Sequence, residues 1–304
     1  MKTNFRYLFP PLAMFCSCIL GAAEPAVEEE VTEGIPDYLG SLVEEEEGPE
    51  VPALFRDDAL LDESHSNREL GVNVYTSPSI SKIFSQLEEL PAIPEEYVLR
   101  NRPARLSTSS GKVALEMGFL LADGFIAVCS SHMNDVKPIA LELSRYGRAL
   151  GVGERMEVHS AALLEQAEKG NRREFKRIIN NTQSDVNAEL TALGDPDLSH
   201  LIALGGWVRA YEASAAALCD EFDAEKAAII FYPDAPDYFS SIVRGVDPSN
   251  ARNLEIERMC ALLDELATQM ALEEGEVPTP EKVATLRQTA GKLAALIVGE
   301  DYAH

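Results

Sequence analysis

Two runs of apolar and small residues, 113–129 and 198–219, restrict the fold of this chain more than any other feature. Five residues interrupt them: Glu116, Asp123, His200, Arg209 and Glu212. A helix that is apolar on every side must be surrounded by protein or lipid. Each run is short for a membrane span and carries charge near its middle. We therefore expect the two runs to form paired helices at the centre of a protein core, with no transmembrane span in the mature chain.

The remaining sequence from residue 76 onward has apolar residues at helical spacing, and no run of alternating β-branched residues competes. Gly, Pro or an Asx/Ser cap marks each boundary. The expected helices are 79–90, 94–100, 110–131, 135–150, 154–169, 172–193, 197–219, 223–231, 236–244, 248–273 and 280–299. The sequence thus predicts an all-α domain over 76–304, a multi-helix bundle of antiparallel helices around the two apolar central helices.

The first 23 residues have the pattern of an export signal. Lys2 and Arg6 precede an apolar stretch, and small residues follow it, so cleavage is expected between Ala23 and Glu24. This predicts an exported protein, located in the cell envelope (periplasm) or secreted. A lipid anchor at Cys18, which would make an outer-membrane lipoprotein, is the minor alternative.

Residues 24–75 are predicted to be an acidic, mostly disordered tether, because glutamate runs broken by prolines bury little apolar surface. The whole chain has a formal net charge of −25. Nucleic acids and anionic lipid surfaces are unfavourable partners for so acidic a protein. The expected partner is an unknown envelope protein or a small ligand.

Glycines inside the apolar runs cost helix stability relative to alanine, so each needs a reason. Close approach of a neighbouring helix explains Gly118, Gly124, Gly205 and Gly206, with Trp207 covering the contact. A ligand lying against this bare backbone is the alternative.

Several short motifs occur in a fixed order along residues 76–219. They are Ser77-Pro78, Ala114-Leu115 with Gly118, Ala122-Asp123, Leu150-Gly151, Asn180-Asn181 and Gly205-Gly206-Trp207. In this order they resemble an uncharacterised family of exported, often lipid-anchored, all-helical proteins of Gram-negative bacteria. The resemblance implies a helical fold and an envelope location, and it brings no activity.

The charged residues of the apolar runs are the candidates for a polar core or a ligand site. An unpaired buried charge is very costly, so Asp123 needs a partner, and Arg209 on the other central helix is the obvious one. Glu116 lies two helical turns before Asp123 on the same face. A structural salt bridge is the main interpretation, and a ligand or metal site is the alternative.

Cysteines, histidines and one basic cluster complete the candidates. Cys129, Cys219 and Cys260 remain after signal removal, and a Cys129–Cys219 disulfide is an alternative to free thiols. His132 is expected to be a loop or cap residue. The cluster Arg172, Arg173, Lys176 and Arg177 is expected to be a solvated face, with an acidic partner, such as the chain's own acidic segment, as the alternative.

No metal-ligand spacing, nucleophile motif or phosphate-binding loop occurs in the sequence, so no cofactor or metal is expected. The function predicted from these features is an exported, non-catalytic binding or scaffolding protein of the cell envelope. The alternative is an envelope hydrolase or metal-dependent enzyme with a site assembled from Asp123, His132, Glu116 or His200. A third hypothesis is a redox-responsive protein that uses Cys129 and Cys219.

Overall fold

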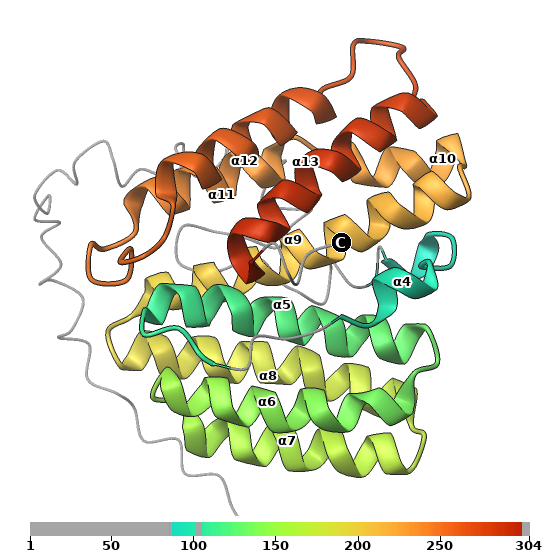
Figure 1. Ribbon diagram of the computed structural model, residues 1–304. Coiled ribbons are helices and arrows are strands. Elements are labelled where there is room, and N and C mark those ends of the chain that lie inside the picture. Colours follow the sequence, from blue (N-terminus) through green and yellow to red (C-terminus); the bar gives the residue numbers. More distant parts are fainter. Residues whose placement is uncertain (1–84, 86, 101–104, 300–304) are drawn as a thin grey trace, which may run out of the picture. The chain divides into compact units, whose positions relative to one another are not determined.

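The computed structural model describes residues 85, 87–100 and 105–299, all within one compact unit, Ala53–His304. The expected signal 1–23, the acidic segment 24–75 and the boundary at residue 76 lie outside these residues. The described part is helical and contains no strand (Figure 1). Its helices are α4 (Glu95–Val98), α5 (Ser110–Cys129), α6 (Val136–Ala149), α7 (Gly153–Glu168), α8 (Arg172–Ala192), α9 (Pro196–Asp220), α10 (Ala224–Ala227), α11 (Asp234–Gly245), α12 (Ile256–Met270) and α13 (Pro280–Val298).

The two apolar runs form α5 and α9, which pack side by side and are buried around almost their whole circumference. Glycines allow this contact. A Cβ added to Gly118 would lie 1.8 Å from the Ile202 carbonyl oxygen, and one added to Gly205 would lie 2.0 Å from that of Leu115. The prediction of close helix contact is therefore confirmed for Gly118 and Gly205, whereas a Cβ added to Gly124 would meet only the side chains of Ile139 and Ile179, at 3.3 and 3.7 Å.

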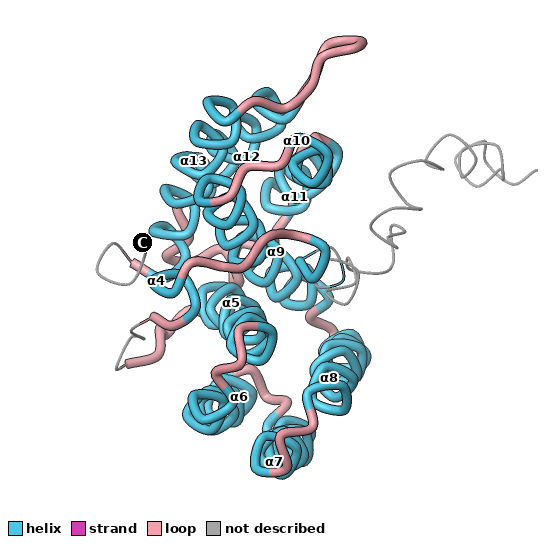
Figure 2. The backbone as a smooth tube through the Cα atoms, turned by 90° about the vertical axis from the view of Figure 1, so that its right-hand side faces the viewer, coloured by secondary structure: helices cyan, strands magenta, loops and turns pink. Residues whose placement is uncertain are grey.

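Amphipathic helices cover the central pair on two sides (Figures 1 and 2). Helices α6, α7 and α8 follow α5 as an up-and-down series, in which α6 and α8 pack against the central pair and α7 packs on α6 and α8. On the other side, α11 and α13 pack against α9, and α12 packs on α11 and α13. Consecutive helices are antiparallel, and four reversals of direction separate α5 from α9. The central pair consequently runs in the same sense, which brings the second halves of both helices together.

Local capping explains several of the helix boundaries. The side chains of Ser109, Asn171 and Thr279 accept a hydrogen bond from a backbone N–H in the first turn of α5, α8 and α13. Gly151 and Gly194 take positive φ angles of 81° and 85° directly after α6 and α8. The predicted ends of these helices are correct to within one or two residues.

The expected helix 248–273 is wrong at both ends, because the structure has α12 over Ile256–Met270. The preceding residues form turns instead. Asp247 Oδ1 accepts hydrogen bonds from the backbone N–H and the hydroxyl of Ser249, and Asn253 has a φ of 61°. These local bonds compete with helix formation, as short polar side chains commonly do.

Candidate functional site

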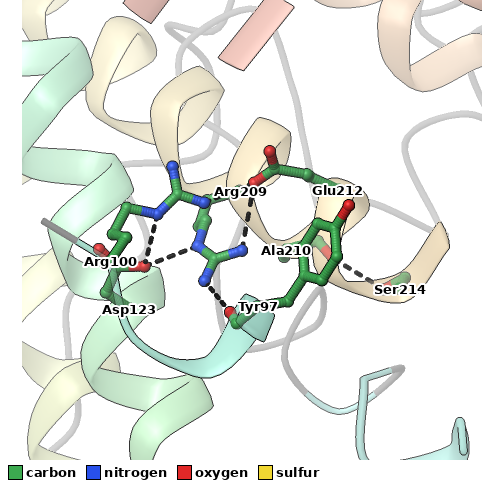
Figure 3. Close-up of polar contacts among 7 residues, drawn as sticks. All are labelled: Tyr97, Arg100, Asp123, Arg209, Ala210, Glu212 and Ser214. Atoms are coloured by element: carbon green, nitrogen blue, oxygen red, sulfur yellow. Dashed lines mark hydrogen bonds and ion pairs between the residues drawn. The ribbon is translucent and has the colours of Figure 1, made fainter. Parts of the chain in front are cut away.

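Four charged side chains from three segments form a closed ring in the core, the charged ring (Figure 3). Arg209 donates from Nε to Asp123 Oδ1 at 2.6 Å and from Nη1 to Glu212 Oε2 at 3.1 Å. Arg100, which follows α4, donates from Nη2 to Glu212 Oε2 at 2.6 Å, and its Nε lies 3.6 Å from Asp123 Oδ1. Arg209 Nη2 also donates to the backbone carbonyl of Tyr97. Each arginine thus contacts both carboxylates.

Water has almost no access to this ring. Arg209 and Glu212 are 0% exposed and Asp123 is 4% exposed. The Phe119 ring lies below the two guanidinium groups, with its centroid 4.4 Å from Arg100 Cζ and 6.0 Å from Arg209 Cζ. Burial, and next the nearby Arg209 charge, lower the pKa of Arg100. The pKa falls because both effects disfavour a second positive charge in a site without water.

The charged ring holds two positive and two negative charges and is therefore neutral. Its arginines are directed at carboxylates of the same ring and at a backbone carbonyl, so they tie the α4 segment to the central helices. The predicted pair of Asp123 and Arg209 is present. Arg100 was not a predicted site residue, and Glu212 had no assigned partner, although Glu212 follows Arg209 by one helical turn, which is a recognisable spacing.

Glu116 lies outside this ring, so the structure does not bring the two carboxylates of α5 into one site. Glu116 Oε2 accepts a hydrogen bond from the Tyr146 hydroxyl of α6 at 3.2 Å. Burial raises the pKa of Glu116, and the Lys112 ammonium one turn earlier offsets this only partly. The arrangement links α5 to α6 through one buried carboxyl group.

Trp207 belongs to an aromatic cluster that joins α9 to α11. Its ring centroid lies 5.2 Å from that of Tyr211 and 5.4 Å from that of Phe239. Nearby, the Tyr238 hydroxyl and His200 Nδ1 are 2.9 Å apart, and burial lowers the pKa of His200. Gly205 faces the backbone of α5, so the predicted alternative of a ligand at the glycines has no space there.

A groove of about 470 Å³ lies where the segment 87–95 passes the end of α5 and the first turns of α8. This volume is within the usual range for ligand pockets. Its lining residues are Leu87, Glu88, Leu90, Pro91, Ala92, Ile93, Glu95, Cys129, Ser130 and Lys176. We call it the α5–α8 groove. Apart from Cys129 and Lys176, which the sequence analysis considered for other roles, none of these residues was predicted as a site residue.

Lys176 is the positive charge among the groove's lining residues, and its partners belong to this chain. Its ammonium binds the Glu88 carboxylate and lies 5.2 Å from the centroid of the Phe125 ring. Cys129 is half-buried beside it, and burial raises the pKa of this thiol, with a partial offset from Lys176.

The other thiol and histidine candidates are placed separately. Cys129, Cys219 and Cys260 are free, so the alternative of a Cys129–Cys219 disulfide is not formed in this structure. His132 Nε2 lies 3.3 Å from Glu95 Oε1, and His132 Nδ1 lies 3.4 Å from Asp135 Oδ2. Within residues 85, 87–100 and 105–299, no three His, Cys, Asp or Glu side chains are placed to hold a metal ion.

Comparison with protein-family models, with curated proteins and with solved structures finds no match for this chain. The resemblance to an exported helical family therefore stays a prediction. A search of the described helices for a segment both long and apolar enough to cross a membrane finds none.

Proposed function

We propose that this chain is an exported, non-catalytic binding or scaffolding protein of the bacterial cell envelope, and that the α5–α8 groove is its ligand site. The observation that carries the proposal is the contrast between the charged ring and the α5–α8 groove. The charged ring is neutral, buried and bound to itself. The groove is open to solvent and combines apolar walls with exposed carboxylates, which is the usual composition of a binding site.

The N-terminal sequence supports the location. The positive start, the apolar stretch and the small residues before Glu24 are the three parts of an export signal. Fractionation of cells that express the full chain, with mass determination of the product, tests this part. We expect the envelope fraction to contain a chain that begins at Glu24, whereas a full-length cytoplasmic product would contradict the location.

A photo-crosslinking experiment tests the ligand site. Benzoylphenylalanine in place of Ala92, an exposed groove residue, is compared with the same label at Val158, which is exposed on α7. We expect a discrete adduct from the Ala92 position alone. The captured molecule, once purified, must bind the wild-type protein and bind Ala92→Trp more weakly, because the indole occupies part of the groove. Equal binding to both proteins would contradict a role for the groove.

A further inference from the structure

The balance of charge in the α5–α8 groove is negative. Glu88 neutralises Lys176, since the two side chains form an ion pair. Glu95 then remains as an acid whose side chain is 77% exposed. Its contact, His132, also lies beside Asp135, so even a protonated imidazole is shared between two carboxylates. A ligand therefore meets the exposed Glu95 carboxylate at this edge of the groove, whereas the Arg172 guanidinium, which donates to Ser131 Oγ, adds a positive charge near Cys129.

The walls of the groove are partly apolar. Leu90 and Ile93 are only partly buried, and Leu87 and Pro91 continue the apolar surface beneath them. The Cys129 side chain adds a neutral sulfur at the floor, because burial raises the pKa of its thiol. A ligand thus gains free energy by burying aliphatic groups here while it presents a positive charge to Glu95.

Two backbone amides along one wall have no hydrogen-bond partner among the described residues. Helical structure ends before Leu90, and Pro94 has the extended angles φ −56° and ψ 141°. Between them, the amide groups of Ala92 and Ile93 donate no hydrogen bond to any described residue. These two amides offer hydrogen-bond donors to the carbonyl groups of a ligand that lies beside the apolar side chains.

From these three features we infer that the groove binds an extended peptide segment that carries a basic residue among aliphatic ones. The inference rests on the proposed function, because it names the class of ligand for the same site. An aliphatic amine without a peptide backbone would satisfy the charge and the apolar walls but would leave the Ala92 and Ile93 amides unpaired.

Selection from a display library of random heptapeptides tests the inference. The library is first depleted on the groove-filled variant Ala92→Trp and then selected on the wild-type protein. We expect the enriched peptides to carry Lys or Arg beside Leu, Ile or Val. Enrichment of acidic peptides, or no enrichment over the depleted library, overturns the inference.

Affinity measurements on an enriched peptide then separate the contribution of the Glu95 charge from that of the main-chain hydrogen bonds. Glu95→Gln is expected to weaken binding about three- to fivefold, as removal of one exposed ion pair does. The matched change Glu257→Gln, on the exposed face of α12, is expected to leave it unchanged. An alkene isostere in place of successive peptide bonds removes the carbonyl acceptors that the Ala92 and Ile93 amides would use, and we expect the peptide to lose at least about tenfold in affinity at one position. Equal loss in both Gln variants, or no loss at any isostere position, overturns the inference.

The outcome also distinguishes failure of the ligand class from failure of the proposed function. If the photo-crosslink at Ala92 captures a small amine or a lipid while no peptide is enriched, the groove is a binding site with a different ligand and the inference is wrong. If neither experiment gives a groove-dependent ligand, the proposed function fails together with the inference.

Discussion

Breaking the charged ring by one charge is expected to destabilise the protein far more than breaking an exposed ion pair. Asp123→Asn keeps the shape of the side chain but leaves Arg100 and Arg209 with Glu212 alone, so the ring carries one excess positive charge. Arg209 is 0% exposed, and water cannot compensate it. Removing one member of a buried pair in this way costs about 3–5 kcal/mol.

A double-mutant cycle tests whether the ring acts as a unit. Arg209→Met alone leaves two carboxylates, Asp123 and Glu212, with Arg100 as their one cation in the ring. We expect this variant to lose a similar free energy of unfolding, about 3–5 kcal/mol. The double variant retains the Arg100–Glu212 bond of 2.6 Å and restores neutrality. We therefore expect its free energy of unfolding to exceed the additive value by at least about 2 kcal/mol.

Urea unfolding followed by circular dichroism at 222 nm measures all three variants, and equal m-values confirm that the compared states are the same. The exposed pair Arg258–Glu255 on α12, at 3.3 Å, provides the control, because Arg258→Ala is expected to cause no measurable change. Additivity within about 0.5 kcal/mol, or a cost below about 1 kcal/mol for Asp123→Asn, would refute the argument from charge balance. A ligand-dependent thermal shift that disappears in Asp123→Asn without loss of stability would instead favour a binding site.

Three further predictions follow from the packing, the buried carboxyl group and the thiols. Gly118→Ala places a methyl group against a backbone carbonyl and should cost about 3 kcal/mol, whereas Gly245→Ala, which meets nothing within 4 Å, should be neutral or slightly stabilising in the same urea assay. Burial raises the pKa of Glu116 in the folded protein above its unfolded-state pKa of 4.5. The stability that the Glu116 carboxyl group contributes is therefore complete below pH 4.5 and is lost as pH rises through the folded-state pKa. The free energy of unfolding of Glu116→Gln relative to that of wild type should consequently increase from about pH 4 to about pH 8. With Cys129 and Cys219 free, a reductant should leave the melting temperature unchanged, and a decrease would indicate a disulfide between them.

The architecture was predictable because its main determinants are local. An all-apolar helix needs neighbours on every side, and the chain has two such runs, so a paired centre follows from the sequence. Caps such as Ser109 and Thr279 act within one turn, which is why several helix ends were placed correctly. The start of α12 was misplaced because the turn at Asp247 depends on a competition between two local hydrogen-bonding patterns that residue spacing does not resolve.

The charged ring was predictable only in part. Asp123 and Arg209 are isolated charges in apolar helices, so each required a partner and each was the other's obvious candidate. The number of partners depends on tertiary packing. Arg100 enters the core from a segment outside both apolar runs, and no pattern near it distinguishes it from the other arginines of the chain.

The α5–α8 groove shows why the charges of one sequence segment do not predict the net charge of the surface that the segment forms. Residues 172–177 were interpreted as a basic cluster that would meet solvent or an acidic partner. In the structure, Arg177 pairs with Glu174 of the same helix, and Lys176 turns to Glu88, a residue 88 positions earlier. The cluster's charge is thus partly neutralised from within the chain, by one carboxylate of the same helix and one from a distant segment.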